Sequence, residues 1–286
     1  MKRNELKSPD FQIPCHGPAK SHKRKYMDER MILEIKNAVL GYRGKAVLQN
    51  VNFTIETGRT ICVIGKNGAG KTTLFKSILG ILPLLRGEIL LDGRSIERWR
   101  QRDYARVIAY VPQARTLPFP FTAFDVVLFG RTAHLSHFAS PGKRDRQIAD
   151  ECMEKLQVSH LRNRIFTQLS GGEQQMIIVA RALTQQPLFL VMDEPASNLD
   201  FGNQVRIISQ VNRLKDDSLG ILMATHSPDH AFMCNAGVMV VHNGKIWKSG
   251  GCNRVITEDV LKEIYGVDVC ICSMKGIKTC MPVIGN

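Results

Sequence analysis

Apolar and polar residues alternate within residues 31–64, near the start of the chain. Val51, Phe53 and Ile55 are separated by polar residues, and this period of two is typical of a strand with one solvated face. Gly58 then marks a turn before the next apolar run. We therefore expect this part of the chain to form an antiparallel β subdomain.

Three segments are almost continuously apolar, which is typical of strands that are buried on both faces of a parallel sheet. They are residues 61–64, 188–192 and 221–225. A glycine-rich loop follows the first segment, two carboxylates follow the second, and a histidine follows the third. Ligands of parallel sheets bind beyond the carboxyl ends of the strands. The pattern predicts an α/β core with a functional site at that edge.

Residues 114–170 change to helical spacing. A connection rich in proline and phenylalanine comes first, and two apolar stripes at helical spacing follow: Phe124, Val127, Leu128 and Phe129, then Ile148, Cys152 and Leu156. We predict a helical insertion over about 114–170, inside an otherwise α/β chain.

Residues 65–73 fit the pattern G-x-x-x-x-G-K-[ST], in which a glycine-rich loop joins a strand to a helix. The N-terminus of such a helix presents backbone N–H groups and the positive end of the helix dipole to a phosphate. Gly68 and Gly70 lack a Cβ, so the backbone can approach phosphate oxygens closely. Lys71 is placed to reach the β- and γ-phosphates, and the Thr72 hydroxyl is placed to bind Mg²⁺. The motif therefore predicts a nucleoside triphosphate site.

A second glycine-rich segment, residues 169–175, begins another predicted helix. Ser170 and Glu173 are three residues apart and form a capping box that satisfies free N–H groups. Two glycines in a first turn each cost about 1 kcal/mol relative to alanine, which is unfavourable for a cap alone. Bare backbone at Gly171 and Gly172 fits the close approach of an anion, and the two interpretations are compatible.

The composition of the 286 residues is that of an ordinary globular protein, with 44% hydrophobic and 23% charged residues. No apolar run approaches the ~20 residues that a membrane-spanning helix needs. Residues 1–30 lack the hydrophobic segment of a secretory signal. Eight cysteines in such a chain indicate reduced thiols in a cytosol.

The formal net charge of +13 fits nucleic acid, an anionic membrane face or a nucleotide, so charge alone selects no partner. Part of the excess lies in residues 1–30, which are poor in apolar residues. We expect these residues to form a basic disordered tail. Weak association of the tail with anionic lipid is one interpretation, and a solvated extension without a function is the favoured one.

Taken together, the motifs resemble those of the nucleotide-binding subunit of an ATP-binding cassette (ABC) transporter, over about residues 31–284. Their order matches that family: Tyr42, the phosphate loop, Gln113, the signature at 169–173, Asp193-Glu194, Ser197-Asn198-Leu199-Asp200 and His226. The signature is diagnostic, because generic phosphate-loop proteins lack it. The resemblance implies the ABC ATPase fold, an α/β phosphate-loop NTPase core with an antiparallel β subdomain and a helical insertion.

The resemblance also implies roles for individual residues, with ATP and Mg²⁺ as cofactors. Glu194 would polarise the attacking water as general base, with His226 and Gln113 completing the catalytic set. Thr72, Gln113 and Asp193 would hold Mg²⁺. ATP contacts are assigned to Tyr42, Gly65, Lys66, Asn67, Gly68, Ala69, Gly70, Lys71, Thr72, Thr73, Ser170, Gly171, Gly172, Glu173 and Asp200.

One chain carries one phosphate loop and one signature, so the resemblance implies a head-to-tail dimer with a second ATPase subunit. Transmembrane permease subunits and a substrate-binding protein are further implied partners, and no nucleic acid is expected. The subunit is expected at the cytoplasmic face of the membrane. We expect the permease to dock beside Gln113, in a groove that includes Phe119, Phe121 and Phe124. Core packing explains these aromatic residues about as well.

Four short strings are similar to those of importer ATPases for iron chelates, haem and cobalamin: Gly130-Arg131, residues 199–204, 226–231 and 265–268. They imply the import of a metal chelate. An ABC exporter ATPase and an ABC ATPase that acts on nucleic acid are the alternatives. DNA-repair members separate the two main motifs by long coiled coils, whereas Lys71 and Ser170 are 99 residues apart here without heptads.

The last residues, about 267–284, predict a β-hairpin. A two-residue turn is strained there, so we predict a three-residue loop that pairs Ser273 with Ile277. One face of the hairpin would then carry three thiols, with Cys270 directly opposite Cys280 and Cys272 two residues along. Such a cluster would bind a soft metal or oxidise. The favoured interpretation is that these cysteines are reduced and inert strand residues.

Overall fold

The computed structural model describes residues 30–113, 120–136, 138–216, 218–274 and 276–283. The contacts divide the chain after Arg30, and all elements below belong to the unit that begins at Met31. The predicted basic tail therefore lies outside the described residues, except for Arg30.

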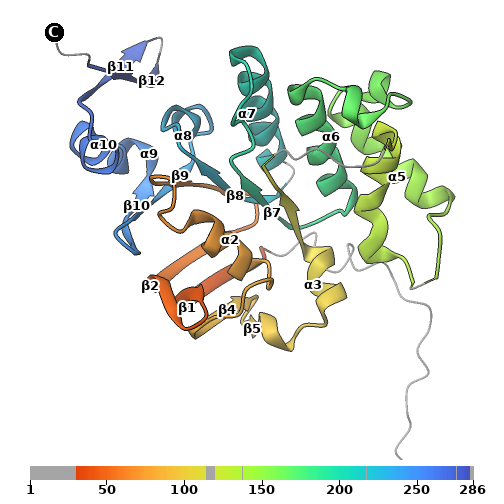
Figure 1. The fold of residues 1–286 in the computed structure, drawn as a ribbon, viewed down its shortest axis with the longest axis horizontal. Helices are drawn as coiled ribbons and strands as arrows, with labels where there is room; N and C mark the ends of the chain where they lie inside the picture. The colour runs from red at the N-terminus through yellow and green to blue at the C-terminus, as the bar shows by residue number, and fades with distance from the viewer. Residues whose placement is uncertain (1–29, 114–119, 137, 217, 275, 284–286) are drawn as a thin grey trace, which may run out of the picture. The chain divides into compact units, whose positions relative to one another are not determined.

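The centre of this unit is a six-stranded sheet with the order β10-β9-β3-β8-β7-β6 (Figure 1). Strands β9, β3, β8, β7 and β6 run parallel, and β10 pairs antiparallel with β9. Every residue of β7 and β8 is buried, which explains their apolar sequences. The strands are β3 (Thr60–Ile64), β6 (Ile108–Val111), β7 (Phe189–Asp193), β8 (Gly220–Thr225), β9 (Gly237–His242) and β10 (Lys245–Gly251).

Helices connect these strands and pack against the sheet, α2 against β7, α6 against β6 and α7 against β8. This arrangement confirms the predicted α/β class. None of the helices in the described part of the chain combines the length and the apolar character needed to cross a membrane. The helices are α2 (Lys71–Ile78), α3 (Gln101–Val107), α6 (Gly171–Thr184), α7 (Phe201–Asp216), α8 (Asp229–Met233), α9 (Cys252–Val255) and α10 (Glu258–Tyr265).

The predicted antiparallel subdomain is a four-stranded sheet with the order β2-β1-β4-β5. Leu33 and Ile35 are 1% exposed, whereas Ile32 is 36% exposed, as expected for a strand with one buried face. The backbone N–H of Gln49 donates to the Gly244 carbonyl at 2.8 Å and so joins β2 to the turn after β9. The strands are β1 (Ile32–Tyr42), β2 (Lys45–Glu56), β4 (Arg86–Leu91) and β5 (Arg94–Ser95), with the 3₁₀ turn η1 (Ile96–Arg98) after them.

Helical elements occupy the interval of the predicted insertion and pack against α6. Arg131 is 6% exposed, and it donates from Nε to Asp145 Oδ1 at 2.8 Å and from Nη1 to the Thr184 carbonyl at 3.0 Å. A Cβ at Gly130 would overlap the Arg181 carbonyl oxygen, so the string Gly130-Arg131 has a packing role. The elements are α4 (Ala123–Leu128), η2 (Phe129–His134), α5 (Lys143–Lys155), η3 (Ser159–Leu161) and η4 (Phe166–Gln168).

The predicted aromatic groove is wrong for Phe124, which is 4% exposed and packs in the core. A capping box of Thr122 and Asp125 fixes the start of α4 and turns this side chain inward. Phe121 is 36% exposed, and its ring meets the edge of Phe129 at a centroid distance of 5.0 Å. Phe119 lies outside the described residues.

Strands β11 (Val269–Met274) and β12 (Ile277–Pro282) form the predicted hairpin, but with another register. Met274 pairs with Ile277, so Cys280 lies opposite Ile271. Successive residues of a strand face opposite sides, so the prediction that Cys270 and Cys280 share a face is wrong. Gly276, at φ +80°, takes the left-handed conformation that a short turn needs. In the described residues, no group of three histidine, cysteine or carboxylate side chains is placed to hold a metal ion.

Candidate functional site

The loop between β3 and α2 is shaped for an anion by its glycines. Gly68 has φ +79°, and Gly70, the residue before α2, has φ +111°. The N-cap residue of α2 is Gly70, which has no side chain to cap the helix, so the first N–H groups of the helix are available to a ligand. A Cβ at Gly65 would overlap the Val241 carbonyl oxygen, so this position also needs glycine. The loop therefore offers bare backbone and the positive end of a helix dipole at one place.

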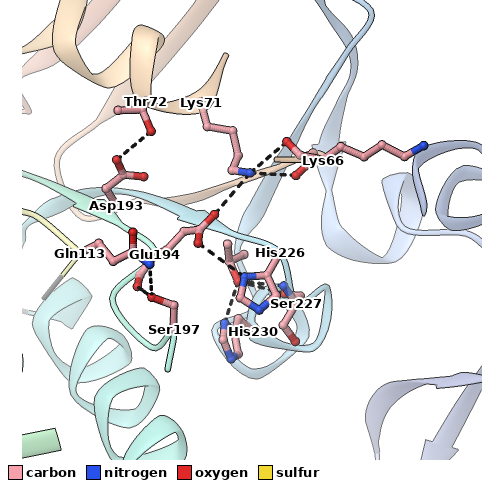
Figure 2. A network of polar contacts seen from close by, with 12 residues as sticks. Lys66, Lys71, Thr72, Gln113, Asp193, Glu194, Ser197, His226, Ser227 and His230 are labelled. Carbon is pink, nitrogen blue, oxygen red and sulfur yellow. Dashed lines mark hydrogen bonds and ion pairs between the residues drawn. The ribbon is translucent and has the colours of Figure 1, made fainter. Parts of the chain in front are cut away.

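Lys71 holds the centre of this loop with its side chain only 5% exposed. Its Nζ donates to the carbonyl oxygens of Gly65 at 2.8 Å and Lys66 at 3.3 Å. The same atom is 3.4 Å from Glu194 Oε1 (Figure 2). The ammonium group thus lies between the phosphate loop and the acidic end of β7.

Asp193 and Thr72 face each other across the site, as Figure 2 shows. The Thr72 hydroxyl donates to Asp193 Oδ2 at 3.0 Å, and the Tyr110 hydroxyl donates to the same oxygen at 3.4 Å. Burial raises the pKa of Asp193, while the hydrogen bond from Thr72 acts in the opposite direction. A divalent cation would compensate a partly buried carboxylate. A hydroxyl and a carboxylate are oxygen ligands of the kind that Mg²⁺ prefers, so these residues fit the ion.

Glu194 directly follows β7 and has φ +49°, the left-handed conformation. This turn directs its carboxylate toward the loop and toward His226. Oε1 is 3.4 Å from Lys71 Nζ, and Oε2 is 3.7 Å from His226 Nδ1 (Figure 2). Non-glycine residues adopt this conformation rarely, so the direction of the Glu194 side chain depends on an unusual backbone turn at the end of β7.

Gln113 reaches the same network through Ser197. Its Nε2 donates to Ser197 Oγ at 3.0 Å, and the Ser197 hydroxyl donates to the Glu194 carbonyl at 2.9 Å. Ser197 was identified in the sequence only as part of the string before Asp200, and Tyr110 was not identified as a site residue. No sequence signal separated Tyr110 from an ordinary strand residue.

His226 follows β8, with its side chain 58% exposed. The segment behind it is fixed by Thr225, whose Oγ1 lies 2.8 Å from His230 Nδ1 and accepts the Ser227 N–H at 3.1 Å. Burial lowers the pKa of His230 to about 4, so this imidazole is neutral at neutral pH.

The signature residues make a separate local structure. Ser170 caps α6, and it exchanges hydrogen bonds with Glu173 in the predicted capping box. These bonds hold the pKa of Glu173 below its ordinary value. A Cβ at Gly172 would overlap the Asn203 side chain, which is bonded to Asp200. No hydrogen bond or ion pair within the described ranges joins the signature to the network around Lys71.

Tyr42 lies at the end of β1, with 42% of its surface exposed. The Lys76 ammonium is 6.0 Å from the centroid of its ring. The ring is therefore open to a ligand on the surface, and its contact with an adenine base stays a prediction.

Known proteins share both the sequence and the fold. The family described as ABC transporter matches residues 48–197. An uncharacterized ABC transporter ATP-binding protein of Haemophilus influenzae is 38% identical over 235 residues, covering 82% of this chain and 89% of that protein. The iron(3+)-hydroxamate import ATP-binding protein of Bacillus subtilis is 31% identical over 230 residues, covering 80% and 86%. A solved ABC transporter described as metal-chelate type, in an inward-facing conformation, aligns with a TM-score of 0.79 and 28% identity, covering 89% of this chain and 98% of that one.

The family match spans more than half of the chain, and the relatives match over most of their length. These matches agree with the polar network at the carboxyl edge of the sheet. The chain therefore belongs to the ABC transporter family, as an ATP-binding subunit that hydrolyses ATP.

Proposed function

We propose that this subunit powers the import of a metal chelate, with Glu194 as the general base of ATP hydrolysis. The observation that carries the catalytic part is the position of Glu194 between Lys71, at 3.4 Å, and His226, at 3.7 Å. A carboxylate at this place can accept a proton from water, while the lysine beside it binds phosphate oxygens.

The phosphate loop binds the β- and γ-phosphates through its N–H groups and Lys71. Thr72 and Asp193, 3.0 Å apart, hold Mg²⁺ in this proposal, and Gln113 completes its surroundings. When bound, Mg²⁺ neutralises charge on the phosphate oxygens. Glu194 takes the proton from the attacking water, and His226 orients that water and the γ-phosphate. Tyr42 stacks on the adenine base at the outer end of the site.

The second half of the site comes from a second copy of the chain. ABC ATPases dimerise and work with transmembrane permease subunits. We propose a head-to-tail pair in which Ser170, Gly171, Gly172 and Glu173 of one subunit contact the ATP of the other. The bare backbone of Gly171, which is exposed, supports this arrangement. Asp200 caps α7 beside the signature and would lie at the same interface.

The permease subunits dock on the face that carries Gln113 and the exposed ring of Phe121. Residues 114–119, which belong to this face in our prediction, lie outside the described residues. Cross-linking from positions 120–125 to the permease tests the assignment.

The proposal of a metal chelate as cargo rests on the two relatives that are named for such cargo and on the four short strings. With a substrate-binding protein and permeases, the subunit would act at the cytoplasmic face of the membrane. An exporter ATPase is the alternative. The test reconstitutes the subunit with its permease in lipid vesicles and supplies a ferric chelate, cobalamin, haem or a free divalent metal on either side. ATP-dependent transport of one of these compounds would identify the cargo, and the side from which it moves would give the direction.

The substitution Glu194→Gln tests the catalytic proposal. The amide cannot accept the proton, so kcat should fall by about 10²-fold or more while ATP affinity is kept. The variant should accumulate as an ATP-bound dimer in size-exclusion chromatography. Glu151→Gln, on the exposed side of α5, is the matched control and should behave like the wild type. Near-normal hydrolysis by Glu194→Gln would remove this residue from the role.

A further inference from the structure

The C-terminal segment from α10 to β12 is bonded to the residues that carry His226. The Tyr265 hydroxyl donates to the backbone carbonyl of His226 at 2.9 Å, although the two residues are 39 positions apart. The rest of the Tyr265 side chain packs against the hydrophobic core. A phenol ring anchored in the core thus contacts the backbone of the residue beside Glu194.

Local structure fixes where Tyr265 points. Thr257 caps the start of α10 by accepting the Val260 N–H, and Tyr265 is the last residue of this helix. Gly266 follows at φ +73° and turns the chain toward β11. Burial raises the pKa of the Tyr265 hydroxyl to about 12, so the hydroxyl keeps its proton and donates it over the physiological range.

A second bond fastens the same segment nearby. The backbone N–H of Cys280, on β12, donates to Asp229 Oδ1 at 2.8 Å, and β12 packs against α8. Glu258 Oε1 accepts the Ile271 N–H at 2.9 Å and so holds β11 to the start of α10. The segment therefore contacts both the carbonyl of His226 and the helix that begins three residues later.

His226 has few fixed contacts through its own side chain. The imidazole is 58% exposed, and Glu194 Oε2, at 3.7 Å, lies beyond hydrogen-bond distance. The position of the ring therefore depends on how firmly its backbone is held. Catalytic groups need placement within about 0.5 Å, which supporting bonds from neighbouring residues supply.

We propose that Tyr265 is a positioning residue for ATP hydrolysis, which holds His226 in place through its backbone carbonyl. The inference rests on the proposed role of His226 and extends it to the C-terminal segment, which carries no family motif for nucleotide binding. Tyr265 itself contacts no substrate. Loss of its hydroxyl should change the rate of the chemical step rather than the binding of ATP.

Tyr265→Phe removes only the hydroxyl and keeps the ring. Loss of one hydrogen bond to a positioned backbone should lower kcat about fivefold and leave the KM for ATP within about twofold. Tyr104→Phe is the matched control, because the buried Tyr104 hydroxyl also donates to a backbone carbonyl, that of Ile78, away from this network. It should keep the wild-type kcat. An equal loss in both variants, or none in Tyr265→Phe, would overturn the inference.

Two further measurements separate this inference from the proposed role of His226. In a His226→Ala background, Tyr265→Phe should have no additional effect on kcat, because it acts through the missing imidazole. The ¹⁵N resonances of the His226 ring should shift in Tyr265→Phe and not in Tyr104→Phe. Full activity of His226→Ala would overturn the role of His226. A different result would overturn only the inference about Tyr265. In that case His226→Ala would have a low kcat, while Tyr265→Phe would keep the wild-type kcat and unchanged resonances of the His226 ring.

Discussion

The phosphate-loop half and the signature half of the site differ in how their residues are held. In the first half, contacts join residues far apart in sequence, as Thr72 with Asp193 at 3.0 Å and Lys71 with Glu194 at 3.4 Å show. In the second half, Ser170 and Glu173 bond to each other within one helical turn. The phosphate-loop half is therefore assembled by the strands of the sheet, whereas the signature half is formed locally at the start of α6.

The difference indicates which half the chain completes by itself. The parallel strands bring a lysine, two carboxylates and a histidine to one edge, so the first half is formed inside a single chain. The signature has its capping groups satisfied and presents exposed backbone at Gly171. Such a surface is prepared for a ligand held by another molecule, in agreement with the proposed head-to-tail pair.

Mixing two inactive variants should give the largest effect among the tests of this comparison. Lys71→Ala damages the first half, and Gly171→Glu places a negative charge where the partner's phosphate would lie. Each variant alone should lose about 10²-fold of its ATPase activity. In a mixed dimer one site combines both defects and the other has none. Mixtures should therefore regain up to about a quarter of the wild-type rate, because about half of the dimers are mixed and each has one intact site.

Gly171→Glu is chosen because a Cβ there meets nothing closer than Leu199 Cδ2, at 3.6 Å. An acidic residue in the first turn also suits the helix dipole, so the variant should fold. If the mixture stays inactive while both variants are folded and associate, the signature does not act across a dimer.

Alanine substitutions of the two signature glycines should have smaller effects, and they separate the structural role of one glycine from the proposed binding role of the other. A Cβ at Gly172 would displace the Asn203 side chain, so Gly172→Ala should lower the free energy of unfolding by about 1–3 kcal/mol. At Gly171 there is room for a methyl group. The helix propensity of alanine is better than that of glycine by at most about 1 kcal/mol, so Gly171→Ala should raise the free energy of unfolding by a few tenths of a kcal/mol. Its ATPase activity should nevertheless fall several-fold, because the new methyl group faces the partner's nucleotide. Urea unfolding and ATPase assays of both variants measure this contrast, and equal behaviour of the two would contradict it.

The first half could be predicted from sequence because its signals are local. The phosphate loop, the carboxylate pair and His226, to which we assign the chemistry, each follow a strand that is recognisable by its apolar run, and parallel strands end at the same edge. The loop of residues 65–73 and Asp193-Glu194 are recognisable from neighbouring residues alone. The fold class followed from the same runs.

Three features could not be predicted, one because of a local turn and two because of contacts between distant parts of the chain. The register of the final hairpin was wrong because Met274 pairs with Ile277, and a shift of one residue moves Cys280 to the other face. Phe124 was placed in a groove because its burial depends on the packing of α4. Tyr265 appeared only as part of a string, since its bond to His226 joins positions 39 residues apart.

The two halves also differ in how they should respond to acid. The pKa of His230, behind His226, is lowered to about 4 by burial and by the nearby charge of His226, while Asp229 acts in the opposite direction. A neutral buried histidine stabilises the fold above its unfolded pKa, near 6.5, and this contribution is lost as the pH falls toward 4. The pKa of Glu173, in the signature, is also lowered, by its bonds to Ser170. The stability that this carboxylate contributes is present above the ordinary pKa of a glutamate, and it is lost only as the pH falls below that value.

The window between pH 6.5 and 4.5 therefore separates the response of His230 from that of Glu173. Burial also lowers the pKa of His134, in η2, so the part of the response that belongs to His230 is the part that its substitution removes. The wild type should lose up to about 3 kcal/mol of its free energy of unfolding across the full titration of His230. His230→Gln should be less stable at pH 7.5, because it loses the contact with Thr225, and it should show a smaller loss on acidification. His160→Gln, an exposed histidine, is the control and should keep the wild-type slope. Urea unfolding at several pH values gives the slope of the free energy of unfolding against pH for each variant. Equal slopes in the wild type and His230→Gln would show that His230 does not hold this half of the site.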